Sequence, residues 1–271
     1  MANVILVHLE TEQTAAGLLQ AAGRLGELAG GARVDVLVVR LPPEATILPS
    51  EEVLTPRQAA FVREREDARI ATLRACFDRW AAAAPPAVSP SWIDIEDLAD
   101  AAVRGYGARA DAIVLPRPTE GDHATAQHEL HAALFGTGRP VLVVPPGPVG
   151  SFGRRVAIAW RDDRHAVRAV LSAVRSREVP EKLFVLAGRK DGAAEPRIPD
   201  ILLEHGVGAE LHVLEIGPKP LGATLLAKAR ALGADMLVMG AYAHSPFREF
   251  ILGGMTRYML AHADLPVLMR H

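Results

Sequence analysis

Short apolar runs alternate along the chain with longer segments whose apolar residues recur at helical spacing. Continuous apolar runs are typical of strands that are buried on both faces of a sheet, and the intervening segments are typical of helices that cover it. This order predicts βα units and a mainly parallel, open sheet. The predicted strands are Val4–Leu9, Val34–Val39, Ser91–Ile95, Ala112–Leu115, Val141–Val144, Val156–Trp160, Leu183–Ala187, Glu210–Leu214, Met236–Met239 and Pro266–Met269.

A segment rich in proline and glycine, residues 145–150, divides these strands into five and five. Proline lacks the amide that a strand needs, so this segment is the natural linker. The sequence therefore predicts an α/β chain of two tandem domains, residues 1–146 and 151–271. Each domain is expected to be a five-stranded, mainly parallel open sheet with helices on both faces.

The two halves resemble each other in detail. In each half an aspartate precedes the fourth strand and a proline leads into the fifth. Asp111 and Pro140 are 29 positions apart, and Asp235 and Pro266 are 31 positions apart. This agreement predicts an internal repeat.

The first half carries extra residues before its fourth strand, mostly in the segment Pro56–Ala84. Thr55 can cap a helix there, Pro56 suits the first helical position, and Pro85 closes it. The apolar positions recur at roughly helical spacing: Phe61, Ile70, Leu73, Phe77 and Trp80. We expect one long amphipathic helix that covers a sheet face.

Composition narrows the classes of partner. The 271 residues hold 30 basic and 32 acidic side chains, which predicts neither nucleic-acid binding nor a polybasic membrane surface. No apolar run approaches the roughly 18 residues that span a bilayer, and the first ten residues read as a strand, not a signal peptide. We expect a cytoplasmic protein without a membrane partner. The single cysteine, Cys76, is expected to be a packed residue.

Several catalytic motifs are absent from the sequence. It contains neither a GxxxxGK[ST] phosphate loop nor a GxSxG nucleophile elbow. His128-Glu129-Leu130-His131 resembles a zinc-protease motif, but the second histidine comes one residue too early. We interpret this segment as a solvated helix face, with a divalent-metal site including His123 as the alternative. The prediction is a protein that is not an enzyme, with no catalytic residues and no metal.

The segment from Gly240 to Thr256 has glycines where a strand enters a loop and again where a helix begins. Glycine lets the backbone approach an anion, and the first amides of a helix attract phosphate. Gly253, Gly254, Met255 and Thr256 are the candidate phosphate-binding residues, the last through its hydroxyl as well. The alternative is that these glycines only permit tight turns.

Ligands of open parallel sheets collect beyond the carboxyl ends of the strands, where the strand order reverses. In the second half Trp160 and Asp162 follow the first strand and Ala187 ends the second. A nucleotide base can lie against these residues while its phosphates meet the glycine segment.

The glycine segment resembles the universal stress protein signature G-x2-G-x9-G-[ST]. The chain reads Gly240-Ala-Tyr-Ala243, nine further residues, and then Gly253-Gly254-Met255-Thr256. The resemblance, strong in the second half, implies an adenine nucleotide alpha hydrolase-like fold and a stress-response role. It also implies that ATP or a related nucleotide binds the second domain without catalysis, with Gly240 and Ala243 joining the residues above.

The chain departs from the signature at several positions. Ala243 replaces the second glycine, Gly254 stands at the serine or threonine position, and Trp160-Arg161 occupies the place where ATP-binding members carry an acidic residue. In the first half, Pro116–Gly121 is proline-rich and offers few amides, so that domain is predicted to be structural.

Two functions stay open. One is a nucleotide-responsive stress protein, and the other is a scaffold that binds an unknown protein partner and no nucleotide. The resemblance further implies that the two domains pair through their last strands as a pseudo-dimer within the chain, possibly with a second copy in a homodimer.

Overall fold

The computed structural model describes residues 3–43, 55–119, 124–174, 178–241 and 254–271. All ten predicted strands are present, with ends displaced by a few residues because ladder pairing continues past the apolar runs. The first half contains β1 (Asn3–His8), α1 (Glu12–Leu28), β2 (Ala32–Arg40), α2 (Pro56–Ala82), β3 (Val88–Glu96), α3 (Ala99–Gly107), β4 (Ala112–Pro116), α4 (Ala124–Gly136) and β5 (Val141–Val144). The second contains β6 (Arg155–Trp160), α5 (Arg164–Val174), β7 (Lys182–Arg189), α6 (Asp200–Glu204), β8 (Glu210–Glu215), α7 (Leu221–Ala231), β9 (Met236–Gly240), α8 (Gly254–His262) and β10 (Val267–Arg270).

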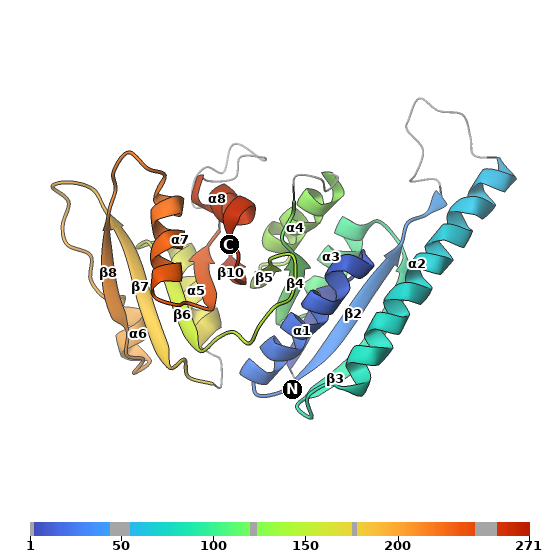
Figure 1. The fold of residues 1–271 in the computed structure, drawn as a ribbon, viewed down its shortest axis with the longest axis horizontal. Coiled ribbons are helices and arrows are strands. Elements are labelled where there is room, and N and C mark those ends of the chain that lie inside the picture. The colour runs from blue at the N-terminus through green and yellow to red at the C-terminus, as the bar shows by residue number, and fades with distance from the viewer. Residues whose placement is uncertain (1–2, 44–54, 120–123, 175–177, 242–253) are drawn as a thin grey trace.

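The strands form one sheet in the order β3-β2-β1-β4-β5-β10-β9-β6-β7-β8 (Figure 1). Within each half the order is third, second, first, fourth, fifth, and all pairs are parallel. The halves meet where β5 pairs antiparallel with β10, Met269 opposite Val141. The expected α/β class and the internal repeat are confirmed, and the two five-stranded sheets join edge to edge.

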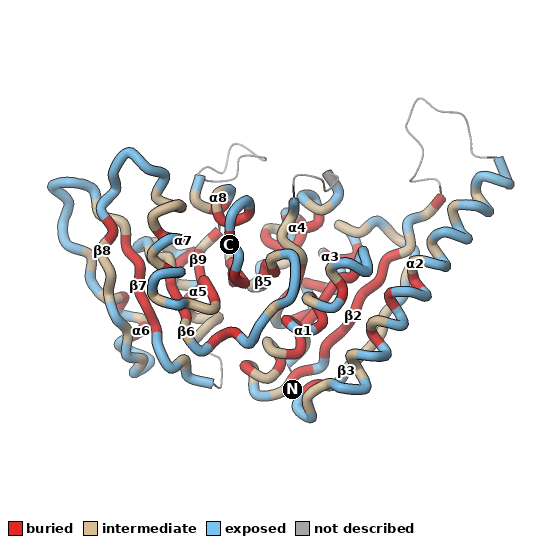
Figure 2. The backbone as a smooth tube through the Cα atoms, in the orientation of Figure 1, coloured by how far each residue is buried: buried red, intermediate tan, exposed pale blue. Residues whose placement is uncertain are grey.

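Helices cover both faces of the sheet. Buried side chains of α1, α2, α5 and α6 form the core on one face, and those of α3, α4, α7 and α8 form the core on the other. The central strands are buried along most of their length (Figure 2). None of the helices in the described part of the chain has the length and apolar character that a bilayer crossing requires.

Helix α2 covers the sheet only with its C-terminal part. Thr55 and Gln58 form the capping box that begins it, as the predicted cap at Thr55 requires. Its buried residues are Ile70, Leu73 and Phe77, whereas Phe61 is 59% exposed. The expectation that Phe61 belongs to the covering face is wrong, because the N-terminal turns extend beyond the sheet (Figure 1). Cys76 is partly buried and packs against the core, as expected.

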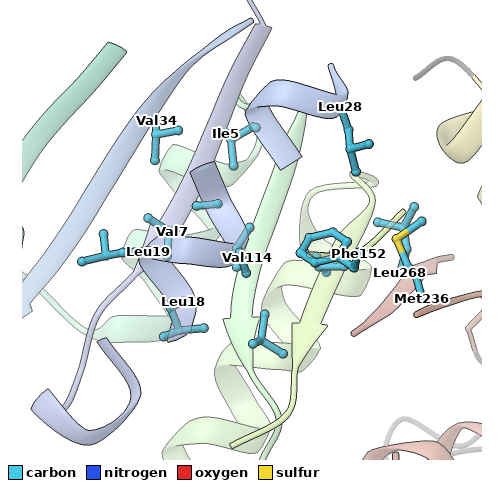
Figure 3. Packing of buried hydrophobic residues seen from close by; sticks show 14 of the residues in the cluster. Ile5, Val7, Leu18, Leu19, Leu28, Val34, Val114, Phe152, Met236 and Leu268 are labelled. Atoms are coloured by element: carbon cyan, nitrogen blue, oxygen red, sulfur yellow. The ribbon is translucent and has the colours of Figure 1, made fainter. Parts of the chain in front are cut away.

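The linker also contributes to the core. Phe152, just after the proline-glycine segment, is 1% exposed and lies near Leu28, Met236 and Leu268 (Figure 3). Gly153 follows with a φ of 90°, and a Cβ there would lie 2.7 Å from Leu28 Cδ1. The linker therefore connects the two halves along the chain, and Phe152 also packs in the hydrophobic core that they share.

Candidate functional site

Three strand ends of the second half lie side by side at the edge where its strand order reverses. Strand β6 lies between β7 and β9, although β7 and β8 both come between β6 and β9 in the chain. Trp160 at the end of β6 pairs with Ala187 of β7, and Gly240 ends β9. The structure thus brings these three predicted residues together, with Asp162 exposed in the loop after β6.

Gly240 packs directly on the first turn of α5. A Cβ at this position would lie 2.7 Å from the amide nitrogen of Ala166 and 2.9 Å from His165 Cβ. Because backbone atoms cannot move aside easily, only glycine fits without displacing the helix. Gly240 therefore has a packing role that does not depend on any ligand.

Asp163 holds the start of α5 and was missed as a site residue. Its Oδ1 accepts hydrogen bonds from the amides of His165 and Ala166, both at 2.9 Å, and its Oδ2 accepts one from Arg161 Nε at 2.5 Å. Burial alone would raise the pKa of this carboxyl, but the amides and the guanidinium outweigh it and lower the pKa. An aspartate just before a helical run is an N-cap signal, so the sequence contained this information.

The phosphate-binding candidates are only partly described. Ala243 and Gly253 lie outside the described residues. Gly254 begins α8, is exposed, and has open space where a Cβ would be. Met255 is half-buried. Thr256 is 2% exposed, so its side chain is buried in the first turn of α8 and does not lie on the surface.

Trp160 and the first turn of α8 belong to different faces of the sheet. The Trp160 side chain packs against the core beneath α5 and α6, whereas Met255 packs against the core beneath α7 and α8. A ligand that touches both must therefore cross the carboxyl ends of the strands. Open parallel sheets bind their ligands at that edge.

The equivalent place in the first half holds a buried polar pair. His8 Nδ1 lies 2.6 Å from Glu129 Oε1, and both side chains are 3% exposed. Burial alone would lower the pKa of His8, but the Glu129 carboxylate raises it above the usual value. The interpretation of Glu129 as part of a solvated helix face is wrong, since it points into the core from α4.

This pair has an apolar counterpart in the second half. The Val4 carbonyl accepts a hydrogen bond from the Asp111 amide, and the Arg155 carbonyl accepts one from the Asp235 amide. His8 lies four positions after Val4, and Ala159 lies four positions after Arg155. Glu129 and Met255 each lie 11 positions before the proline that leads into the last strand. The described residues contain no group of three metal-ligating side chains. A histidine within an otherwise apolar strand was the signal for the pair.

The loop after β4 ties the first half to the second. Arg117 Nη1 donates to the carbonyls of Leu260 and Ala261, both at 2.8 Å, near the C-terminal end of α8. The Arg117 amide also donates to the Val144 carbonyl at 2.7 Å. These contacts fit a structural role for this loop, and they place a cation at a helix end that attracts it.

Aromatic rings bridge the halves beside α5. The His165 ring lies 4.4 Å from that of His271, which lies 4.6 Å from Phe135 of α4, centroid to centroid. Burial lowers the pKa of both histidines, and the nearby arginines Arg164 and Arg168 add to the effect. Both rings are therefore held in the neutral form near neutral pH.

The fold is a tandem of two open α/β sheets, and in each half the strand order reverses between the first and the fourth strand. Residues 157–271 match the universal stress protein family. That segment of the chain belongs to this family, and the first half repeats its topology.

Solved structures share the fold of the whole chain. A universal stress protein from Archaeoglobus fulgidus DSM 4304 aligns over 99% of this chain and 96% of its own, at 15% identity and a TM-score of 0.70. A functionally unknown protein from Pseudomonas aeruginosa PAO1 aligns over 99% and 92%, at 14% identity and a TM-score of 0.60. The cytoplasmic domain of a prokaryotic cation chloride cotransporter aligns over 99% and 95%, at 14% identity and 0.54. Among curated proteins none matches the chain.

Proposed function

We propose that the chain is a stress-response protein whose second half binds ATP or a related adenine nucleotide without catalysis, in the cytoplasm. The observation that carries the proposal is the edge between β6 and β9, where the strand order reverses beside the glycine-flanked loop of a universal stress protein domain. Beyond this edge an adenine ring would lie near Trp160 and Ala187, and phosphates would meet the first amides of α8.

Gly254 offers a variant that tests the phosphate contact. Its missing Cβ faces open space, so Gly254→Asp adds a negative charge at the start of α8 without a clash. We expect at least about tenfold weaker ATP binding, because a carboxylate there repels phosphate and occupies the amides. Gly208→Asp is the matched control, since Gly208 is also exposed with open space around it in the same half.

The direct measurement starts from freshly purified protein. Denaturation followed by chromatography identifies any released nucleotide, and calorimetric titration of the apo protein with ATP gives the affinity. The proposal is refuted if denaturation releases no nucleotide and the titration gives no binding heat at millimolar ATP. Phosphate release above background would refute the proposal that the protein does not catalyse.

A scaffold that binds a protein partner and no nucleotide is the second candidate. It is favoured by the Asp163 carboxylate, which already occupies the first amides of α5, and by Arg161, which is held on Asp163. The loop contacts of Arg117 also fix one half against the other, as a rigid partner surface requires. Further association into a homodimer belongs to the same proposal, and sedimentation at several concentrations tests it.

A further inference from the structure

A cavity of about 330 Å³ lies where the two halves join, and most of the strand residues that line it are near the amino ends of their strands. Its lining includes Leu28 of α1 and Ala173 of α5, with Ile5, Met236 and Leu268 from the strands below. Figure 3 shows Leu28, Met236 and Leu268 around the buried Phe152. The volume is at the lower end of the range for small-molecule sites, which are mostly apolar with a few polar groups.

The cavity follows from the way the two halves join. Helices α1 and α5 each pack on the strands of their own half, and β5 and β10 meet between them. Phe152 fills one part of this seam, and its neighbour Gly153 lines the cavity. Val179 also lines it and is 76% exposed, so the cavity opens to solvent there.

The Arg270 guanidinium gives the mostly apolar cavity a preference for negative charge. Arg270 Nη1 donates to Ser172 Oγ at 2.9 Å, and both residues line the cavity. The Ser172 hydroxyl donates in turn to the Arg168 carbonyl at 2.9 Å, so it fixes the orientation of the guanidinium. A planar guanidinium matches a carboxylate better than it matches a hydroxyl or an amine.

The other charged groups of the lining also contact protein groups, as Arg270 contacts Ser172. Asp111 accepts from the Val4 amide at 2.8 Å, and Glu178 pairs with Arg24 at 2.6 Å; both acids are exposed. Arg139 donates to the Ala108 carbonyl at 2.9 Å. The acids therefore lie at the hydrated rim, while Arg270, half-buried, stands beside the apolar strands.

We propose that this cavity binds a medium-chain aliphatic carboxylate, with the carboxylate on Arg270 and the alkyl chain against Leu28, Met236 and Leu268. Because residues of both halves contact such a ligand, its binding would stabilise the interface between the halves and raise the free energy of unfolding of the whole chain. The proposal does not rest on nucleotide binding, although Arg270 pairs in register with Gly240 of β9.

The probe is octanoate, titrated into the full chain by calorimetry below its micelle concentration, with octanol and octylammonium as head-group controls. We expect octanoate to bind at least about tenfold more tightly than either control, because only it pairs with the guanidinium. At about 100 times its Kd, octanoate should raise Tm by about 5 °C or more. No binding at millimolar octanoate, or equal binding of all three probes, would overturn the proposal.

Two variants locate the site. Arg270→Met should lower octanoate affinity at least about tenfold and leave octanol unchanged, whereas Ala173→Phe should fill the cavity and abolish both. Arg74→Met and Ala71→Phe, both on the exposed surface of α2, are the matched controls and should bind octanoate as the wild type does. Wild-type affinity in both cavity variants would overturn the site.

A third measurement needs no substitution. Met236 belongs to the core on the cavity face, whereas Met239, Met255, Met259 and Met269 belong to the core on the other face. In protein labelled with 13C at the methionine methyl groups, octanoate should shift the Met236 resonance most. Larger shifts of the other four would show binding elsewhere and refute the assignment.

Discussion

The His8–Glu129 pair is the sharpest difference between the cores of the two halves. The second half has Ala159 and Met255 at the corresponding positions. Glu129→Met alone leaves a histidine buried at 3% exposure with no carboxylate at 2.6 Å, and His8→Ala alone leaves a buried carboxylate. Removing one partner of a buried pair costs about 3–5 kcal/mol, whereas exchanging both for apolar residues is often neutral or stabilising. We expect each single variant to lose about 3 kcal/mol or more of unfolding free energy.

The double variant His8→Ala/Glu129→Met should regain most of that loss, because it restores the apolar pair of the other half. Urea unfolding at pH 6 and 25 °C, followed by circular dichroism, gives the four free energies of the cycle. Glu64→Met on the exposed surface of α2 is the control for the change of residue type. The reasoning is refuted if a single variant loses less than about 1 kcal/mol, or if the losses simply add in the double variant.

The same pair predicts a pH dependence. The folded pKa of His8 is raised, so the stability it contributes is fully present below the unfolded value of about 6.5. That contribution is lost as the pH rises through the folded pKa. The wild type should therefore lose stability between pH 6 and pH 9 by an amount that the double variant does not lose.

Three further predictions concern the start of α5. Asp163→Ala should cost about 1–2 kcal/mol of unfolding free energy in urea titrations, because the amides of His165 and Ala166 lose their acceptor; a loss below about 0.5 kcal/mol would contradict the cap. Gly240→Ala should lower stability by about 1–3 kcal/mol through the 2.7 Å approach to the Ala166 amide, and unchanged thermal melting would show that the helix moves aside freely. Burial lowers the folded pKa of His165 and His271, so the stability of the fold should fall as the pH drops below their unfolded pKa of about 6.5. His271→Phe keeps a ring against His165 and should reduce the loss of unfolding free energy between pH 7 and pH 5. An unchanged loss in this variant would refute the role of the pair.

Local pattern was sufficient for the elements of the fold. The continuous apolar run Val141–Val144 predicts a strand buried on both faces, as it is, and Thr55 with Pro56 begins α2 through contacts within one turn. The repeat around Asp111 and Asp235 could likewise be predicted from the sequence, because each aspartate makes the same kind of hydrogen bond just before the fourth strand of its half. Both aspartates accept amide hydrogen bonds from the first strand of their half.

The candidate site was predictable only where it depends on strand ends. Trp160, Ala187 and Gly240 meet because parallel strands present their carboxyl ends at one edge. The Asp163 cap was readable from its position but was not recognised. The pairing of Glu129 with His8 was not predictable, because the residues are 121 positions apart and a helix pattern does not state which face meets a strand.

The sequence by itself determined the α/β class, the ten strands, the linker and the resemblance of the second half to universal stress proteins. These depend on periodicity, turn chemistry and the spacing of glycines, all of which act over short stretches of chain. Only the tertiary structure decided that Gly240 lies against the α5 backbone, that Glu129 is buried on His8, and that the seam between the halves encloses a cavity beside Arg270. Each of these depends on contacts between residues far apart in the chain, and packing in three dimensions sets those contacts.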